Sequence, residues 1–421
     1  MVIFTDNNNF LNVFWWFVII AFLIGILFSN AILPISTVVL VVFSLWSVKF
    51  RISFVELKKN PIVLWFLLLY LIYLTGVFIT ESKENWLRDI FIKLPLLVFP
   101  LIFLNKKINQ LIVLQNVVFI FNVFVCMVGL ASFINYLIDY QYYNDSIFKA
   151  KPIPVITGLN HIYFSMMLAF SALNVFAGLI VKTKISENLK ISKYYTIVNV
   201  VMLILYFVFL HTISARTGLI AFYFSFVFIT VFFLVQKRKH YHSVVIIVVM
   251  ALTGFLSVKY VDSLHNRYMK TIEDIKVYQQ KGNINYYSFS TRVEYWKACF
   301  HLFKKNPLFG TGNADLKSEL YKYLTENKPV LDERNRLDPH NQYLQVLAGT
   351  GIFGFLIFTG LMLFLLLKAM KLKNYYLLPL VLVVSISFLG ESVLERQAGI
   401  AFVLFFILLG WKIGELQTEK H

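Results

Sequence analysis

The chain alternates between long apolar runs and short polar connections. A membrane-spanning helix needs about 20 mostly apolar residues. The predicted spans are residues 11–29, 31–48, 61–80, 89–104, 109–138, 161–181, 194–211, 213–235, 243–260, 342–367, 374–390 and 397–411. The fourth run contains Lys93, Pro95 and Pro100, and a kinked helix persists in a membrane when its neighbours satisfy the freed carbonyl groups. This pattern predicts an all-α polytopic membrane protein with about twelve transmembrane helices.

One polar stretch is much longer than the other connections and follows the ninth span. Residues 1–260 are predicted to form transmembrane helices 1–9, residues 261–341 a large loop with amphipathic helices outside the membrane, and residues 342–421 helices 10–12 with a short C-terminal tail. The first run, from Leu11 to Ser29, lacks a preceding basic segment and is followed at once by another run. We therefore expect a retained helix and not a cleaved signal peptide.

Composition supports the membrane assignment. Hydrophobic residues make up 59% of the chain and charged residues 14%, whereas soluble domains have roughly 45–50% and about 25%. A soluble enzyme is thereby excluded. The 39 Lys and Arg residues outnumber the 22 acids, which in a soluble protein would suggest a nucleic acid partner. In a polytopic membrane protein, an excess of Lys and Arg instead reflects how the loops are distributed between the two sides of the membrane. Membrane lipids are therefore expected as partners, and nucleic acid is not.

Basic residues of the short loops predict the orientation, because the cytoplasmic side of a membrane collects Lys and Arg. Eighteen of them fall on one side, and six fall on the other: Lys83, Arg88, Lys149, Lys151, Arg216 and Arg396. Both termini are therefore predicted to be cytoplasmic, and residues 261–341 to lie outside. The polar connections with the most varied side chains are also on the outer side, so we expect the activity on the extracytoplasmic face.

Several common chemistries have no motif in this sequence. Cys126 and Cys299 form no CxxC pair, and the chain has no HExxH, EF-hand or DxD motif. Neither a metal nor another cofactor is therefore expected. No acid falls in the middle of a predicted span, which disfavours a proton- or sodium-coupled transporter because such proteins usually need an intramembrane carboxylate.

Arg216 is the first candidate for substrate binding. It lies in the segment His211–Gly218 between the seventh and eighth spans, about one helical turn below the predicted outer surface. An arginine at that depth must bind an anion or extend its side chain to the interface. The sequence therefore indicates either an anion site or an interfacial anchor.

A second candidate, Arg292, lies in the outer loop. Thr291 and Glu294 have the spacing of a capping box, which predicts Arg292 in the first turn of a helix. An apolar stripe then follows at helical spacing through Val293, Trp296, Phe300 and Phe303, and it ends before Asn306 and Pro307. A helix N-terminus with an arginine suits a phosphate. The alternative is a solvated charge on a surface helix.

His340 is the third candidate and lies in Asp338-Pro-His-Asn-Gln-Tyr343, where the loop enters the tenth span. The positive end of a helix dipole disfavours imidazolium, which would leave a neutral base. The alternative is a histidine that only sits at the interface. His161, Glu391 and Arg396 are further outer-side residues that could line the same cavity or could simply cap and pair at helix ends.

These motifs together resemble the O-antigen ligase family, within the superfamily that includes O-antigen polymerases and bacterial O-linked oligosaccharyltransferases. The resemblance rests on Ser214-Ala-Arg216-Thr-Gly218, Thr291-Arg292 with Trp296, Pro307-Leu-Phe-Gly310-Thr-Gly312, and His340-Asn341-Gln-Tyr343-Leu344 followed by Gly349-Thr-Gly351-Ile-Phe-Gly354. It is strongest between about residues 205 and 400. Before that stretch, only the hydrophobic pattern and the number of spans agree.

The resemblance implies a helical glycosyltransferase of the bacterial inner membrane that works on the periplasmic face. Its donor would be a glycan on undecaprenyl pyrophosphate and its acceptor lipid A-core. Arg216 and Arg292 would bind the pyrophosphate, and His340 would activate or orient the acceptor hydroxyl. Two guanidinium groups can stabilise a departing pyrophosphate without a metal, and attack from the opposite face would invert the anomeric centre.

Other functions stay open on the sequence alone. A polymerase of the same superfamily or a protein O-oligosaccharyltransferase would use a similar donor and differ in the acceptor. A lipid-linked oligosaccharide flippase would translocate the donor without breaking a bond. A membrane scaffold would need none of Arg216, Arg292 and His340.

Overall fold

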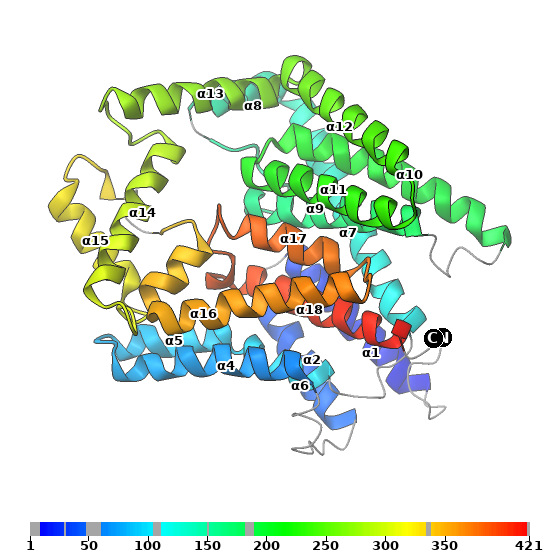
Figure 1. The fold of residues 1–421 in the computed structure, drawn as a ribbon, viewed down its shortest axis with the longest axis horizontal. Coiled ribbons are helices and arrows are strands. Elements are labelled where there is room, and N and C mark those ends of the chain that lie inside the picture. The colour runs from blue at the N-terminus through cyan, green and yellow to red at the C-terminus, as the bar shows by residue number, and fades with distance from the viewer. Residues whose placement is uncertain are drawn as a thin grey trace. The chain divides into compact units, whose positions relative to one another are not determined.

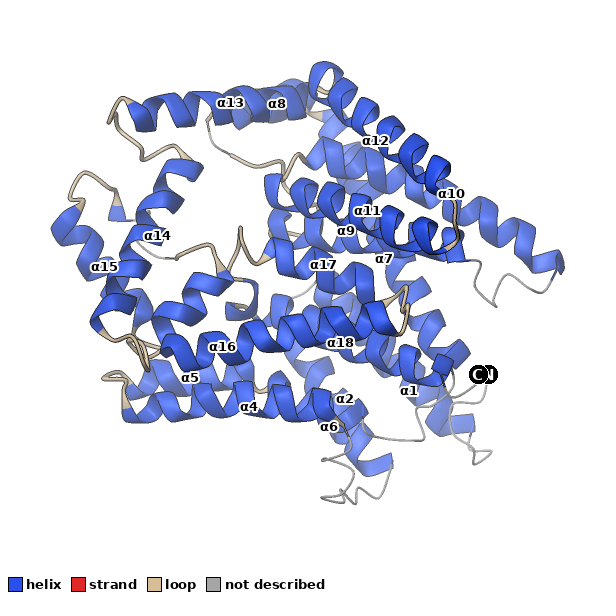
Figure 2. Ribbon diagram, in the orientation of Figure 1, coloured by secondary structure: helices blue, strands red, loops and turns tan. Residues whose placement is uncertain are grey.

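The computed structural model describes residues 9–28, 31–47, 60–103, 111–149, 151–181, 189–333 and 338–418. Every regular element within these ranges is helical (Figure 2). Eight of the helices are long and apolar enough to cross a membrane, and three shorter apolar helices cover Val13–Phe28, Ile32–Ser44 and Leu377–Ser387. The prediction of an all-α polytopic membrane protein is confirmed.

The chain forms two compact units, each built from separate segments. The first unit comprises Met1–Leu114, Val277–Leu372 and Phe388–His421, and the second comprises Gln115–Lys276 and Lys373–Ser387. The sequence-based division into residues 1–260, 261–341 and 342–421 describes membrane topology instead of compact units, and it stays a prediction. The basic loops at residues 48–59, 104–110 and 182–188, on which much of the predicted orientation rests, lie outside the described residues.

The first unit contains most of the N-terminal and C-terminal helices. They are α1 (Asn9–Phe28), α2 (Ile32–Ser47), α4 (Pro61–Thr75), η1 (Gly76–Phe78), α5 (Lys83–Lys93), α6 (Pro95–Phe103), α14 (Ser288–Lys305), α15 (Leu316–Asn327), α16 (Gln342–Lys371), η5 (Val393–Glu395) and α18 (Gln397–Thr418). Helix α4 packs against α6 and α16, and α18 packs against α6 (Figure 1). Phe22, Phe99 and Phe405 meet where α1, α6 and α18 converge, with ring centroids 4.7–6.4 Å apart. These three buried rings pack α1, α6 and α18 together.

The second unit is organised around one buried helix. Its elements are α7 (Leu111–Ile138), α8 (Tyr140–Phe148), α9 (His161–Val181), α10 (Leu189–Ile213), α11 (Arg216–Gln236), α12 (His240–Tyr260), α13 (Asp262–Gln279) and α17 (Leu377–Ser387). Helix α9 packs against α10, α11 and α17, and nearly all its residues from Tyr163 onward are buried. In α12, by contrast, Ser243 is the one buried residue among those described, as expected of a helix that faces lipid.

The predicted fourth span, residues 89–104, is not a single helix. Helix α5 ends at Lys93, Leu94 forms a turn, and α6 begins at Pro95. Proline is tolerated at the first position of a helix but has no N–H for a continuing one. Helix α5 also begins well before the predicted span and carries polar residues such as Glu84 and Arg88. The charged residues therefore belong to a separate short helix.

Within residues 261–341, α14 departs from the prediction at its start. It begins at Ser288, and the Thr291 hydroxyl donates to the carbonyl of Tyr287 at 3.0 Å. The predicted capping box at Thr291 is therefore wrong, because the helix starts at Ser288 and Thr291 lies inside it. Arg292 is the fifth residue of α14 and lies outside the first turn, in which the sequence predicts it. The predicted apolar stripe is correct in part. Trp296 and Phe303 pack, partly buried, against the core of this region, but Phe300 is 49% exposed, and the buried face itself contains Tyr295, Ala298, Cys299 and Leu302. The predicted end before Asn306 is confirmed.

Two glycine positions join the segment after α14 to a break in α16. Gly351 has φ +66° and ψ −166° in the middle of α16, and Gly310 has φ +72°. The N–H of Ile352 donates to Pro307 O, and the N–H of Thr311 donates to Ala348 O, both at 2.9 Å. A Cβ atom on Gly351 would collide with the carbonyl of Leu308. The segment therefore supplies an acceptor for a backbone donor that the break in α16 frees.

We predict that Gly351→Ala destabilises the protein by about 2 kcal/mol or more, because alanine is strained at this φ and its Cβ meets backbone. Gly76→Ala is the matched control, since a Cβ there meets only the Trp86 ring at 3.6 Å. Thermal unfolding of both variants in detergent measures the difference. Equal melting temperatures would contradict the role assigned to Gly351.

Candidate functional site

A histidine and a carboxylate meet directly before α16. His340 Nδ1 lies 3.1 Å from Glu391 Oε2, with the imidazole 35% exposed and the carboxylate 7% exposed. His340 has φ +46°, an uncommon conformation for a residue other than glycine. Trp296 Nε1 donates to the carbonyl of Pro339 at 3.2 Å, and the N–H of Asn341 donates to Ser392 Oγ at 3.3 Å. Bonds on both sides therefore hold His340 in this conformation.

The contact with Glu391 gives the imidazole a defined chemical role. A carboxylate at Nδ1 favours the tautomer with its proton on that atom and leaves Nε2 as the acceptor. The same carboxylate stabilises the imidazolium that forms when Nε2 takes a proton. The sequence argument relied instead on the dipole of the following helix, but α16 begins at Gln342 with Asn341 as its N-cap.

Two arginines act on the Glu391 carboxylate. Burial raises its pKa, but the hydrogen bond with His340 and the positive charges of His340, Arg292 and Arg396 lower it further, and the result is below the usual value. Glu391 is therefore ionised at neutral pH. Arg396 Nη2 also lies 3.9 Å from Asp338 Oδ2. The structure thus brings together four of the residues singled out in the sequence: Arg292, His340, Glu391 and Arg396.

Helix α14 contributes a second side chain beside His340. The ring of Tyr295 lies 6.1 Å from the His340 ring, between centroids. Burial and the negative charge of Asp338 raise the pKa of Tyr295 to about 12 although Arg292 opposes this shift, so the phenol is neutral at physiological pH. Sequence reasoning missed Tyr295, because the predicted stripe placed its neighbour Trp296 on the buried face.

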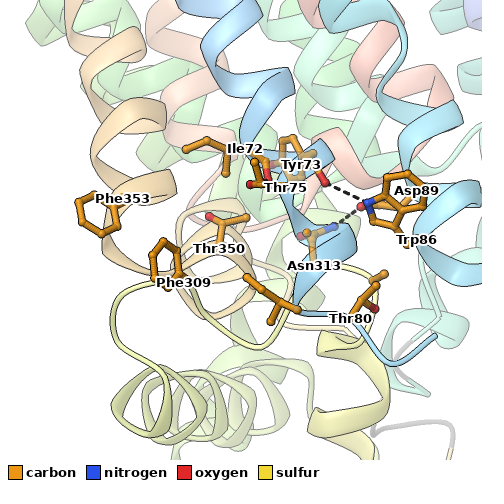
Figure 3. Close-up of a pocket in the computed structure, with 14 residues that line it drawn as sticks. Ile72, Tyr73, Thr75, Thr80, Trp86, Asp89, Phe309, Asn313, Thr350 and Phe353 are labelled. Carbon is orange, nitrogen blue, oxygen red and sulfur yellow. Dashed lines mark hydrogen bonds between the residues drawn. The ribbon is translucent and has the colours of Figure 1, made fainter. Parts of the chain in front are cut away.

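A buried ion-pair network supports this region. Lys93 is fully buried and pairs with Asp89 and with Glu395, 2.8 Å away. The Asn313 amide donates to Asp89 at 2.8 Å, as the dashed line in Figure 3 shows, and to Glu395 at 3.2 Å. Gln342 donates to the other oxygen of Glu395 at 3.0 Å. The network thereby joins α5, the turn before α15, the start of α16 and η5.

The network fixes the backbone on either side of the His340–Glu391 pair. Gln342 follows His340 by two residues, and its side-chain oxygen accepts from the N–H of Leu394 at 2.7 Å. Glu395 is four residues after Glu391. A lysine inside an apolar run was the sequence signal for this network, but neither acidic partner follows from the hydrophobic pattern.

A polar pocket of about 600 Å³ opens onto the acidic side of the pair. Its lining includes Arg88, Tyr321, Gln345, Glu391 and Arg396, which come from α5, α15, α16 and the segment around η5. Hydroxyl-rich ligands suit such a lining because donors, acceptors and an aromatic ring are all present. A neighbouring pocket, shown in Figure 3, is lined more by apolar side chains such as Ile72, Trp86, Phe309 and Phe353.

Arg216 and His161 belong to the second unit. Arg216 is the first residue of α11 and His161 the first of α9. The two helices pack closely near these ends, where Gly218 leaves room for Ser165. His211, which opens the same sequence motif, is buried, with Nδ1 2.6 Å from the carbonyl of Phe207 and Nε2 2.7 Å from the Tyr223 hydroxyl. His211 is therefore a structural residue.

Comparison with known proteins concerns both the residues around His340 and those around Arg216. Residues 200–359 match the family model described as O-antigen ligase. The matched range includes Arg216, Arg292, His340 and the glycine-rich part of α16, and it ends before Glu391 and Arg396. The resemblance drawn from the sequence motifs is confirmed. No curated protein sequence gives a significant match to the chain.

We predict that Lys93→Met destabilises the protein by about 3–5 kcal/mol, because it leaves the carboxylates of Asp89 and Glu395 close together without their cation. Lys322→Met is the matched control, since Lys322 is exposed on α15. Thermal unfolding in detergent, together with expression level, measures the effect. A Lys93→Met protein as stable as the control would show that the buried network is dispensable.

Proposed function

Because residues 200–359 match the O-antigen ligase family, we propose that this multi-pass membrane protein is a glycosyltransferase that moves a glycan from undecaprenyl pyrophosphate to lipid A-core. In this proposal, the reaction takes place on the periplasmic face of the bacterial inner membrane, and both termini are cytoplasmic. One observation carries the proposal: the His340–Glu391 pair, with Arg292 and Arg396 acting on it, beside a polar pocket.

The proposed reaction is an inverting substitution at the anomeric carbon. Nε2 of His340 takes the proton of the acceptor hydroxyl while the hydroxyl oxygen attacks from the face opposite the pyrophosphate. The bond between the anomeric carbon and the pyrophosphate oxygen breaks, and undecaprenyl pyrophosphate leaves with the bonding electron pair. Glu391 stabilises the imidazolium, as a carboxylate does in a catalytic triad.

Arginines are proposed to take the role that a metal plays in many glycosyltransferases. Negative charge grows on the pyrophosphate as the anomeric bond breaks, and guanidinium groups already in place stabilise it without a metal. Arg292 has this role in the first unit, within electrostatic reach of Glu391. Arg216 is proposed to stabilise the same negative charge from the second unit, where it lies at the N-terminus of α11 and the helix dipole also favours an anion.

The polar pocket is proposed to hold sugar near the base. Glu391 and Arg396 are part of its lining, and Tyr321 provides an aromatic face against which a pyranose ring can pack. His161 is proposed to line the outer end of the second unit next to Arg216.

A polymerase or a protein O-oligosaccharyltransferase would use the same donor chemistry, so the acceptor separates these functions from a ligase. The test supplies purified full-length protein with undecaprenyl-pyrophosphate glycan and, in separate reactions, lipid A-core, unmodified carrier-linked repeat units, or a Ser/Thr peptide. Release of undecaprenyl pyrophosphate only with lipid A-core supports the proposal. Product with repeat units identifies a polymerase, and product with the peptide a protein glycosyltransferase. Donor that stays intact in every reaction would support a flippase or scaffold instead.

We predict that Glu391→Gln lowers kcat about 10- to 100-fold with little change in the KM for the donor, because the imidazolium loses its neutralising charge. His340→Gln removes the base, and its expected loss is about 100- to 10,000-fold. Steady-state release of undecaprenyl pyrophosphate measures both effects. Glu326→Gln is the control, because Glu326 is exposed on α15. Unchanged kcat in Glu391→Gln would contradict the role assigned to the pair.

A further inference from the structure

Helix α13 is anchored in the second unit next to the segment that carries Arg216. Ser263, in the first turn of α13, is fully buried, and its hydroxyl donates to the carbonyl of His211 at 3.4 Å. Leu264 beside it is also buried. Since His211 precedes Arg216 by five residues, the anchor brings the start of α13 close to the N-terminus of α11.

One turn along α13, Arg267 points two of its nitrogen atoms into the protein. Nε and Nη2 of Arg267 are buried and have no hydrogen-bond partner among the residues that the structure describes. The nearest acids along this helix are already engaged: Asp262 accepts from the Tyr140 hydroxyl, and Glu273 pairs with Lys270 at 3.2 Å. Buried polar groups are nearly always hydrogen-bonded in folded proteins, so these two atoms need an explanation.

Arg267 also feels the charge of Arg216. Burial and the positive charge of Arg216 lower the pKa of Arg267 to about 10, which leaves it protonated at neutral pH. Two positive charges held near each other in a partly desolvated site repel, and the fold bears that cost. Such a concentration of positive potential attracts an anion.

We propose that Arg267 and Arg216 together bind the pyrophosphate of the lipid-linked donor, with Arg267 as a binding residue additional to Arg216. The proposal rests on the function proposed above for Arg216. Guanidinium groups bind phosphate through paired, charge-assisted hydrogen bonds, and two of them match the two phosphates of a pyrophosphate. The N-terminus of α11, where Ala215 provides no side-chain cap, adds backbone N–H groups to the same site.

The first test measures binding of geranyl pyrophosphate to the full-length protein in nanodiscs of zwitterionic lipid. We expect Arg267→Gln and Arg216→Gln each to weaken binding about 10-fold or more, as loss of a charge-assisted contact does. Lys276→Gln is the control and should bind like the native protein, because Lys276 is exposed on the same helix. Native affinity in Arg267→Gln would overturn the proposal.

A second measurement separates binding from a structural role. Arg267→Gln removes a charge that has no partner among the described residues, so the melting temperature without ligand should be unchanged or higher. Geranyl pyrophosphate should raise the melting temperature of the native protein, and in Arg267→Gln this rise should be smaller or absent. A variant that melts lower than the native protein but keeps the full ligand-induced increase would show that Arg267 is structural.

The double variant tests whether both arginines contact one anion. If they do, the combined loss in Arg216→Gln/Arg267→Gln differs from the product of the single losses, because contacting sites are not additive. Two independent, multiplicative losses would overturn the shared site.

Further arms of the same experiment distinguish a phospholipid ligand from the pyrophosphate donor. They also distinguish failure of this inference from failure of the proposed function. If the natural ligand is a phospholipid, nanodiscs that contain phosphatidylglycerol will compete with geranyl pyrophosphate, and inorganic pyrophosphate will not; that result overturns a donor site. Binding that needs both arginines, in a protein that transfers no glycan, would retain this inference and reject the proposed function. Normal glycan transfer by Arg267→Gln with native donor affinity would reject this inference and retain the proposed function.

Discussion

The ion pair of Lys93 with Asp89 and Glu395 is the interaction on which the rest of the first unit depends. A lysine with no exposed side-chain surface is costly unless its charge is matched, and removal of its partners would leave that charge uncompensated. Here it is matched by two carboxylates that also accept from Asn313 and Gln342. The network therefore ties four separate stretches of the chain together.

From this network, the geometry of the candidate active site follows. Gln342 and Glu395 are fixed by it, and each lies a few residues from a member of the His340–Glu391 pair. The break at Gly351 serves the same end of α16, because it lets the Pro307–Thr311 segment dock and bring Asn313 to the carboxylates. His340 can therefore keep an uncommon backbone conformation, since bonds from Trp296 and Asn341 hold the chain on both sides of it.

Much of the fold followed from the sequence, because apolar runs of membrane length dominate it. The pattern also found Arg292, His340, Glu391 and Arg396 as separate outer-side residues, and the structure brings these four together. It could not reveal the pairing of His340 with Glu391, which are 51 residues apart. Nor could it find Arg267, whose interest lies in two buried nitrogen atoms and not in its spacing. The misplaced start of α14 has a similar cause: Thr291 and Glu294 fit a capping box locally, but packing of Tyr295 and Cys299 sets the buried face.

The central claim is that His340, oriented by Glu391, activates the acceptor for glycan transfer from the lipid carrier. The most direct measurement is the lipopolysaccharide banding pattern of the native host carrying His340→Ala, taken together with its pool of carrier-linked glycan. We expect full-length glycan to accumulate on the carrier while lipid A-core stays bare. An unchanged banding pattern would contradict the claim, and a core that carries a single repeat unit would show that the protein is a polymerase.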